Sequence, residues 1–303
     1  MKAPDFAYTS PPTIEEVVSL LRQYGSEARL LAGGQSLLPL LNLRLVHASL
    51  LIDLQRIAEL DTLSFDVAQN VLSIGAMVRQ ARVEREALVC RHVPLLVEAV
   101  SYVGHPSIRN LGTIGGSVAH ADPAAQIPAA LLALDASVVL LRSGARRVVP
   151  IREFFLGPLA SCAGADEVVS EILIPCPEGD RVRGWAFVQL ARTANSFPIC
   201  GVAVELVLDG TNRIESARVG LAGVGPTPVR ARSVEVALCG QDANAKVFEE
   251  VASLIGREID PVSDLQASAE YRRRIAGVLV KRALGLALQR AIAARENGKR
   301  EFP

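Results

Sequence analysis

The sequence has few aromatic residues, no closely spaced cysteines and no excess of either charge. Aromatic side chains are 4% of its 303 residues and hydrophobic residues are 50%, so small aliphatic side chains must fill the core. Basic and acidic residues number 32 each. A chain without net charge has no electrostatic attraction for nucleic acid or for an anionic membrane. The length predicts two globular domains.

Cysteine spacing argues against the common metal sites. The sequence has five cysteines: Cys90, Cys162, Cys176, Cys200 and Cys239. No two of them form the CxxC or CxH pairs that zinc sites and iron–sulfur clusters use. We therefore expect reduced thiols and no metal site on this chain.

Long apolar runs are missing as well. The run 131–141 is too short to cross a bilayer and contains Asp135. The first residues lack the apolar core of a signal peptide. We expect a cytoplasmic protein without a membrane span.

The N-terminal half alternates helix and strand patterns. Thr13 and Glu16 have the spacing of a capping box, and apolar residues then recur at helical spacing up to Tyr24. Apolar strands at 28–32 and 49–53 complete a small parallel α/β unit. Beyond them the patterns predict strands at 71–75, 137–141, 147–150 and 167–175, and helices at 77–89, 94–103 and 128–134.

Residues 175–180 are rich in proline and glycine, and we expect a domain boundary there. Strand patterns follow at 184–190, 199–208 and 215–224, which predict an antiparallel meander. The remainder reads as helix, at 245–256 and from about 269 to 294.

Two glycine loops are the strongest local signal for chemistry. Gly33-Gly34 directly follows a predicted strand and precedes Ser36. Gly115-Gly116 stands between Thr113 and Ser117. Glycine lets a backbone approach a phosphate closely, and successive free N–H groups form an anion-binding concavity. Two such loops could grip a pyrophosphate from both sides; the alternative is that each is an ordinary tight turn.

Other nucleotide and hydrolase motifs are absent. The sequence has no GxxxxGK[ST] and no GxSxG, and no paired carboxylates stand out as a catalytic pair. The segment 220–225 superficially resembles GxGxxG, but Pro226 follows where a helix would have to start. His120 has no partner histidine, cysteine or carboxylate cluster nearby, so no catalytic residue stands out.

Several residues keep two interpretations. Asp122 could accept hydrogen bonds from sugar or ribityl hydroxyls, or cap the helix that follows it. Trp185 and Phe187 could contact a cofactor ring or belong to the core. The basic run 272–274 is expected on a solvated or subunit-contacting face.

The two loops resemble the flavin loops of a known family. Ala32-Gly-Gly-Gln-Ser-Leu37 resembles the first flavin loop of the FAD subunit of molybdenum hydroxylases. The second flavin loop of that subunit resembles Ile108-Arg-Asn-Leu-Gly-Thr-Ile-Gly-Gly-Ser117. This subunit is the medium chain of the carbon monoxide dehydrogenase and xanthine dehydrogenase family. The resemblance continues through 119–125, 154–158 and 171–175 and reaches the C-terminal helix at 268–282, so it covers nearly the whole chain.

The resemblance implies an α+β fold. A two-subdomain FAD-binding domain of the PCMH type would occupy residues 1–177. A smaller C-terminal domain of the carbon monoxide dehydrogenase flavoprotein type, with a three-stranded antiparallel sheet and helices, would occupy 178–290. Residues 291–303 are expected to form a flexible tail.

The resemblance also implies which residues hold FAD. They are Ala32, Gly33, Gly34, Gln35, Ser36, Thr113, Ile114, Gly115, Gly116, Ser117, Asp122 and Gln126. Gln126 stands where relatives often carry Asp, which would alter the electrostatics at the flavin. Gln35 stands where relatives often carry His, the residue that can bind flavin covalently in distant oxidases. FAD is therefore expected to bind non-covalently.

The implied function is electron transfer, with no catalytic or metal-binding residue on this chain. A large partner subunit would carry molybdopterin and hydroxylate the substrate. A small partner would carry two [2Fe–2S] clusters, and the three subunits would assemble as a dimer of heterotrimers. FAD would pass electrons to a quinone, a cytochrome, NAD or oxygen. The sequence names neither the substrate nor the acceptor.

Two alternatives stay open. A stand-alone FAD-dependent oxidoreductase of the same superfold would need its own acid or base at the ring, and none stands out. A non-enzymatic nucleotide-binding or assembly protein is disfavoured by the intact glycine loops.

Overall fold

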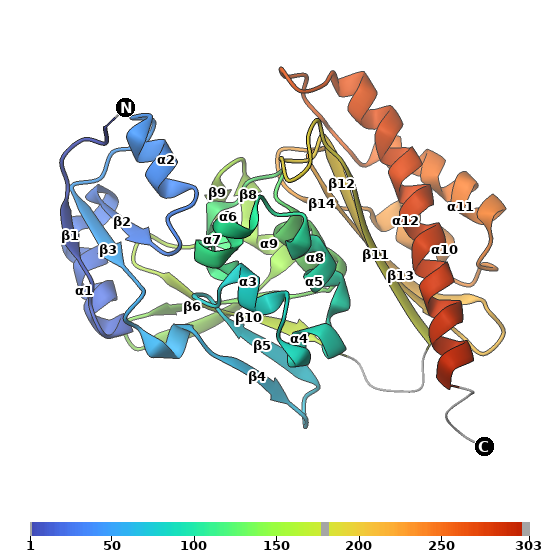
Figure 1. Cartoon of the computed structure of the whole chain (residues 1–303), viewed down its shortest axis with the longest axis horizontal. Coiled ribbons are helices and arrows are strands. Elements are labelled where there is room, and N and C mark those ends of the chain that lie inside the picture. Colours follow the sequence, from blue (N-terminus) through green and yellow to red (C-terminus); the bar gives the residue numbers. More distant parts are fainter. Residues whose placement is uncertain (1, 177–181, 299–303) are drawn as a thin grey trace.

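The computed structural model describes residues 2–176 and 182–298, and the three larger sheets of the described residues follow one another along the chain (Figure 1). The first is a three-stranded sheet of order β1-β3-β2, in which both pairings are parallel. This confirms the predicted parallel α/β unit. Its elements are β1 (Ala7–Thr9), α1 (Ile14–Tyr24), η1 (Gly25–Glu27), β2 (Ala28–Leu31), α2 (Leu37–Asn42) and β3 (Leu50–Asp53).

The first helix begins where the capping box predicted. The Thr13 side chain accepts a hydrogen bond from the Glu16 amide at 3.3 Å. The helix then buries one apolar face, which includes Val17, Val18 and Leu21. That face packs against the buried strand β3 and so fixes the sheet from which the first glycine loop emerges.

The second sheet has five antiparallel strands in the order β4-β5-β10-β6-β7. Its strands are β4 (Leu63–Asp66), β5 (Val71–Gly75), β6 (Ser137–Arg142), β7 (Ala145–Pro150) and β10 (Val168–Pro175), with a separate pair β8 (Phe155–Gly157) and β9 (Ala160–Ser161). The helices around it are η2 (Ala58–Leu60), α3 (Gln80–Val83), α4 (Ala87–His92), α5 (Pro94–Ser101), α6 (Pro106–Leu111), α7 (Ile114–His120), α8 (Gln126–Ala133) and α9 (Ile151–Phe154).

The single helix expected over 77–89 is wrong. The segment forms two short helices, α3 and α4, because the backbone becomes extended at Glu86 with ψ near 118°. This break lets α3 stay close to the second glycine loop, with which Arg79 forms an isolated β-bridge at Thr113.

The third sheet is the predicted meander, in the order β11-β12-β13-β14. A two-residue strand, β14, adds a fourth member to the three expected. The elements are β11 (Val182–Leu190), β12 (Cys200–Leu208), β13 (Ile214–Ala222), β14 (Val229–Arg230), α10 (Arg232–Leu238), α11 (Ala245–Ala252), η3 (Ser253–Arg257) and α12 (Ala269–Gly298).

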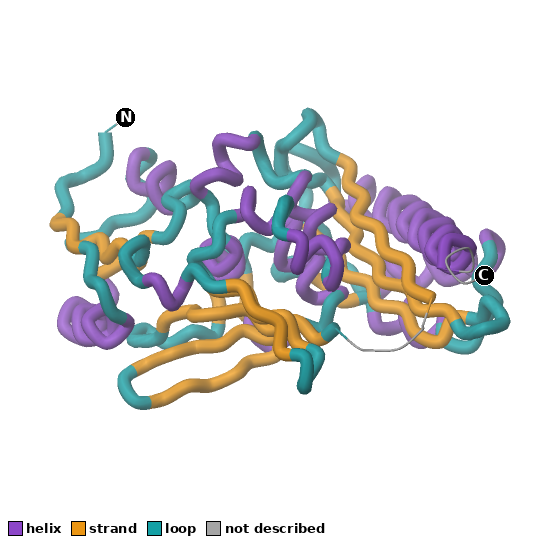
Figure 2. Tube along the Cα trace, turned by 60° about the horizontal axis from the view of Figure 1, so that its bottom comes forward, coloured by secondary structure: helices purple, strands orange, loops and turns teal. Residues whose placement is uncertain are grey.

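Helices cover both faces of this third sheet (Figures 1 and 2). The long helix α12 lies on one face, and α5 and α8 of the preceding domain lie on the other. Two glycines allow the close approach: a Cβ on Gly184 would lie 1.8 Å from the Ala287 carbonyl oxygen, and one on Gly220 would lie 2.1 Å from that of Ala129. All eight residues of α8 are buried, so this helix joins the two cores.

The C-terminal boundary differs from the prediction. Part of the segment 291–303, expected to be a flexible tail, is helical, because α12 continues to Gly298 and buries Ala291. The expected domain boundary at 177/178 lies outside the described residues. No helix within the described ranges is long and apolar enough to cross a membrane.

Candidate functional site

The two glycine loops lie directly against each other, although they are far apart in the sequence. The first loop joins β2 to α2, and the second follows α6 and runs into the first turn of α7, to which Gly115 and Gly116 belong. A Cβ on Gly33 would lie 2.1 Å from the carbonyl oxygen of Leu111 and 2.8 Å from Cα of Gly112. A Cβ on Gly116 would lie 3.4 Å from that of Ala32. Only glycine permits this contact at position 33.

The first loop has unused backbone donors. Within the described part of the chain, the amides of Gly33, Gly34, Gln35 and Ser36 have no hydrogen-bond acceptor. Gly34 has φ of +73°, and the Gln35 side-chain amide donates to the Gly33 carbonyl at 2.9 Å, so the loop has a defined shape. Successive unpaired N–H groups in such a turn bind an anion. This supports the first half of the expected phosphate cradle.

The second loop differs from the expectation, because its amides are already used. The amide of Ile114 donates to Val78 at 3.1 Å and that of Gly115 to Ala76 at 2.9 Å. The Thr113 hydroxyl accepts from the Gly116 amide at 3.0 Å and so caps α7. The second loop therefore offers the first turn of α7 and the Ser117 hydroxyl rather than a row of free amides.

Two serine hydroxyls complete the donor set. Ser36 and Ser117 are both half-buried, and neither hydroxyl has a hydrogen-bond partner among the residues the structure describes. Hydroxyls can donate to phosphate oxygens without adding charge. Together with the amides of the first loop they fit the diphosphate of a dinucleotide.

Asp122 lies in the turn before α8 and Gln126 is the first residue of that helix, and the two side chains form different contacts. One oxygen of Asp122 accepts from the Ala124 amide at 2.8 Å, so this carboxylate shapes the turn before α8. The expectation that Asp122 caps a helix starting at Pro123 is wrong, because α8 begins at Gln126 and its N-cap residue is Ala125. Gln126 is 3% exposed. Its side-chain NH₂ donates to the Tyr102 carbonyl at 3.3 Å and to the Gln189 side chain at 3.1 Å. Gln126 thus joins the two domains at the beginning of α8, which its sequence position did not indicate.

Sequence reasoning missed the residues that support the second loop. Gln80, 5% exposed, lies against Gly112, and its side-chain NH₂ donates to the Thr113 carbonyl at 3.4 Å. The Arg79 guanidinium donates to the carbonyl of Leu111. Neither residue belongs to a motif, so no local signal could have found them.

The remaining candidates fall outside the loops. Phe187 is a core residue, 5.4 Å from the ring of Tyr102, and the half-buried Trp185 lies beneath the Arg290 guanidinium. The expectation that Arg272 is solvated is wrong: it is 5% exposed and ion-paired with Asp264. In the described ranges no three His, Cys, Asp or Glu residues are grouped as metal ligands would be.

Comparison with known proteins gives the family. Residues 4–177 match the model of the FAD binding domain in molybdopterin dehydrogenase, and residues 185–287 match the CO dehydrogenase flavoprotein C-terminal domain. The chain belongs to the FAD-binding family of molybdopterin dehydrogenases. Its members are FAD subunits of oxidoreductase complexes, and the abutting glycine loops lie inside the matched FAD domain.

Relatives of this FAD subunit match along their whole length. The chain is 35% identical over 298 residues to the 6-hydroxypseudooxynicotine dehydrogenase complex subunit alpha of Paenarthrobacter nicotinovorans, which covers 98% of this chain and 99% of the relative. It is 36% identical over 291 residues to the carbon monoxide dehydrogenase medium chain of Hydrogenophaga pseudoflava, covering 96% and 99%. A solved structure of carbon monoxide dehydrogenase from Hydrogenophaga pseudoflava matches with a TM-score of 0.92, at 36% identity and the same coverage.

Proposed function

We propose that this FAD subunit binds FAD non-covalently between its two glycine loops and relays electrons within a molybdenum hydroxylase. In this proposal [2Fe–2S] clusters on a small partner supply the electrons, and an external acceptor takes them. The observation that carries the proposal is the direct contact of two loops, one of which has four unused amides. FAD supplies the redox chemistry that couples one-electron and two-electron steps.

The chain's own residues bind and orient the cofactor. The amides of 33–36 donate to the diphosphate, and the hydroxyls of Ser36 and Ser117 add two further donors. The Asp122 oxygen that does not hold the turn accepts from the ribityl hydroxyls or the ring edge. No lysine or arginine belongs to this set, so binding relies on neutral donors with a fixed geometry. Gln35 cannot form the covalent flavin link that a histidine at its position can form.

The proposed partners follow from the relatives. The carbon monoxide dehydrogenase relative is named a medium chain, and the nicotine-derivative dehydrogenase relative a complex subunit. The substrates in the two names differ chemically, yet the two relatives share about the same sequence identity with this chain. This supports substrate choice on a partner subunit, which we propose to be a large molybdopterin subunit, in a dimer of heterotrimers. The acceptor (quinone, cytochrome, NAD or oxygen) and the cytoplasmic location stay predictions.

The first experiment is FAD titration of the purified chain, followed by fluorescence and visible absorbance. We expect Ser36→Ala and Ser117→Ala each to raise the Kd about tenfold, because a hydrogen bond to a charged group contributes about 1.5–3 kcal/mol. Ser253→Ala is the matched control, since that hydroxyl lies at the start of η3, in the C-terminal domain, and donates to the Glu250 carbonyl at 2.6 Å. A native chain that shows no affinity for FAD would contradict the proposed function.

The second experiment tests the relay. The chain is co-purified with the products of its neighbouring genes, and the complex is analysed for molybdenum and iron. A large molybdenum-containing and a small iron-containing partner are expected. Turnover of a substrate by the chain and FAD alone would instead support the stand-alone oxidoreductase.

A further inference from the structure

The C-terminal domain holds the turn that follows the second glycine loop. The amide of Gly223, just beyond β13, donates to the carbonyl of Pro123 at 2.8 Å. A second contact joins Gln189 of β11 to Gln126, and a third is the close approach of Gly220 to Ala129. The turn 122–125 is therefore fixed by its own Asp122 on one side and by the C-terminal domain on the other.

Arg272 determines where Gly223 lies. One guanidinium nitrogen donates to the carbonyls of Ile199 at 2.5 Å and Gly223 at 3.0 Å. Another donates to both oxygens of Asp264, at 2.8 and 2.7 Å. Gly223 has φ of +76°, and a Cβ there would lie 2.9 Å from the Ile199 carbonyl oxygen. A buried guanidinium is stable only when it is paired and hydrogen-bonded, so it holds these two loops together.

These contacts form a continuous series from the last helix to the candidate flavin site. Arg272 holds the Gly223 carbonyl, the Gly223 amide holds the Pro123 carbonyl, and the adjacent Asp122 carboxylate is oriented by the same turn. The first two links are direct hydrogen bonds between described residues, and the last is the turn itself, which the Asp122–Ala124 hydrogen bond closes. A shift of Gly223 would therefore displace the turn that carries Asp122.

We propose that Arg272 is a positioning residue for the bound flavin, acting through Gly223 on the turn that carries Asp122. The inference rests on the proposed FAD site. A carboxylate interacts with the charge on a reduced cofactor with an energy that depends on their separation. Displacing Asp122 should therefore change both the affinity for FAD and its midpoint potential, without removing any group that touches the cofactor.

The test compares Arg272→Met with the native full-length chain, with FAD affinity and midpoint potential as readouts. We expect the Kd to rise about fivefold or more, as is typical of coupling between sites, and the potential to shift. Arg272→Lys should restore part of both, because a lysine can still donate to the carbonyls. The Asp264 side chain is 46% exposed, so Asp264→Asn should give a smaller change in the same direction. This variant tests the proposal if Arg272→Met does not fold.

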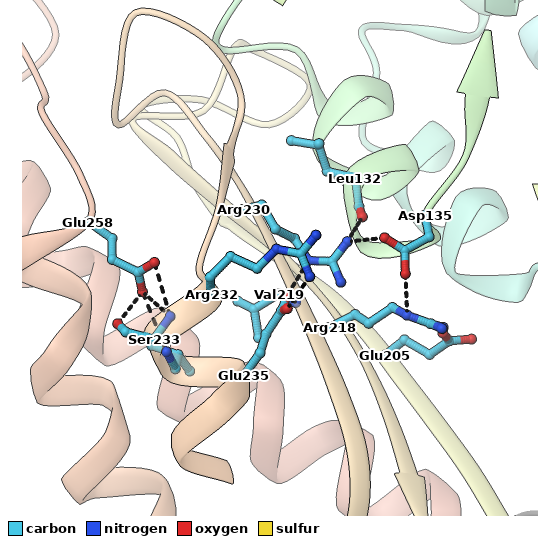
Figure 3. Close-up of polar contacts among 11 residues, drawn as sticks. Leu132, Asp135, Glu205, Arg218, Val219, Arg230, Arg232, Ser233, Glu235 and Glu258 are labelled. Carbon is cyan, nitrogen blue, oxygen red and sulfur yellow. Dashed lines mark hydrogen bonds and ion pairs between the residues drawn. The ribbon is translucent and has the colours of Figure 1, made fainter. Parts of the chain in front are cut away.

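Two matched arginine variants separate positioning from general loosening. Arg273→Met removes a neighbouring surface arginine, paired with Asp260 at 3.5 Å. Arg230→Met breaks a buried network at the far end of α8, where Arg230 bonds the Leu132 carbonyl and Asp135 (Figure 3). Arg230→Met should lower thermal stability, and neither control should move the potential.

Two outcomes would overturn the inference. The first is an Arg272→Met or Asp264→Asn chain with native Kd and native potential. The second is an equal shift of the potential in Arg230→Met. Both differ from failure of the proposed function, in which the native chain itself does not bind FAD.

Discussion

At the scale of single residues, the site depends on positions where a side chain is missing. Gly33 lets the first loop touch the backbone of the second, at Leu111 and Gly112. The neighbouring Gly34 has a positive φ, which glycine adopts without strain. These two residues have different tasks, one for close approach and one for the turn. A substitution at each should therefore fail for a different reason.

Gly33→Ala is expected to destabilise the chain as well as abolish FAD binding. Its Cβ would lie 2.1 Å from the Leu111 carbonyl oxygen, so the two loops must separate. Overpacking of this kind costs about 1–3 kcal/mol. Thermal unfolding followed by circular dichroism measures this cost, and FAD titration measures the binding. Gly157→Ala, where a Cβ would meet nothing within 4 Å, should leave both unchanged.

Gln126→Glu should make stability depend on pH. The native NH₂ donates to two oxygens, on Tyr102 and Gln189, and only a protonated carboxyl could donate to either. Burial and the two acceptors should raise the pKa of the new carboxyl above its unfolded value. The folded state then binds more protons than the unfolded one, so stability falls as pH rises through that interval. Urea unfolding from pH 5 to pH 8 should show this loss; parallel profiles for native and variant chains would refute it.

Sequence reasoning found the glycines but not how their neighbours use them. The small-residue pattern identifies loops because glycine's freedom is a local property. The acceptors for the second loop's amides, Val78 and Ala76, lie in another segment, and no pattern connects the two. The prediction that Arg272 is solvated failed for the same reason. Arg272 belongs to a run of arginines in the sequence, and only the fold brings its acceptors close to it.

At the scale of elements, the N-terminus of α7 is the part of the site that its own sequence determines most completely. Thr113 has extended backbone and its hydroxyl accepts from the Gly116 amide, as in a typical N-cap. The helix ends after one further turn at Ala121, with φ of 53°. Such a short helix has little stability of its own, so the Thr113 cap and the amide hydrogen bonds to Val78 and Ala76 must hold the loop.

Thr113→Ala should weaken the second loop while leaving the first intact. Loss of an N-cap costs about 1 kcal/mol, and the half-buried Gly116 amide would lose its acceptor. We expect a lower unfolding temperature and a higher Kd for FAD. Thr113→Ser keeps the oxygen and should stay close to native in both measurements. If Thr113→Ser is as impaired as Thr113→Ala, the methyl group rather than the cap is responsible.

Long, strongly patterned elements were predictable and short ones were not. The meander strands β11, β12 and β13 and the hairpin β6–β7 were predicted to within a few residues, because alternation and turn signals are local. The two-residue strand β14 and the helices α6 and α10 were missed. Their residues carry little periodicity, and tertiary contacts determine their conformation.

At the scale of the whole molecule, helix α8 links the cofactor domain to the C-terminal domain at both of its ends. Gln126 forms the contact at the beginning of the helix, and Leu132 and Asp135 form it at the end (Figure 3). The second end is a network of charges in which Arg230 also bonds Glu235, and Arg218 bonds Asp135 at 2.7 Å. The domain interface is therefore apolar along α8 and polar at its two limits.

Asp135 is the residue through which acid should loosen this interface. Burial alone would raise its pKa, but the hydrogen bond and charge of Arg230, together with Arg218, hold the pKa below its ordinary value of 3.8. A carboxyl with a lowered folded pKa adds stability above its unfolded pKa, and that stability is lost as pH falls through the folded value. The contribution should thus be complete at neutral pH and disappear only below about pH 3.8.

Asp135→Asn tests this with little other change, because asparagine tolerates the positive φ of 51° at that position. The variant should be less stable than the native chain at pH 7, since Arg230 and Arg218 lose a charged acceptor. The difference should shrink as the pH falls below 3.8, because the carboxyl of the unfolded chain then binds a proton more readily than that of the folded chain. Calorimetry at pH 7 and at pH 3 gives both values. Asp135 lies at the far end of α8 from Asp122, so FAD affinity at pH 7 should not change. If the difference in stability between the native and variant chains stays constant with pH, the charge of Asp135 is not what holds the two domains together there.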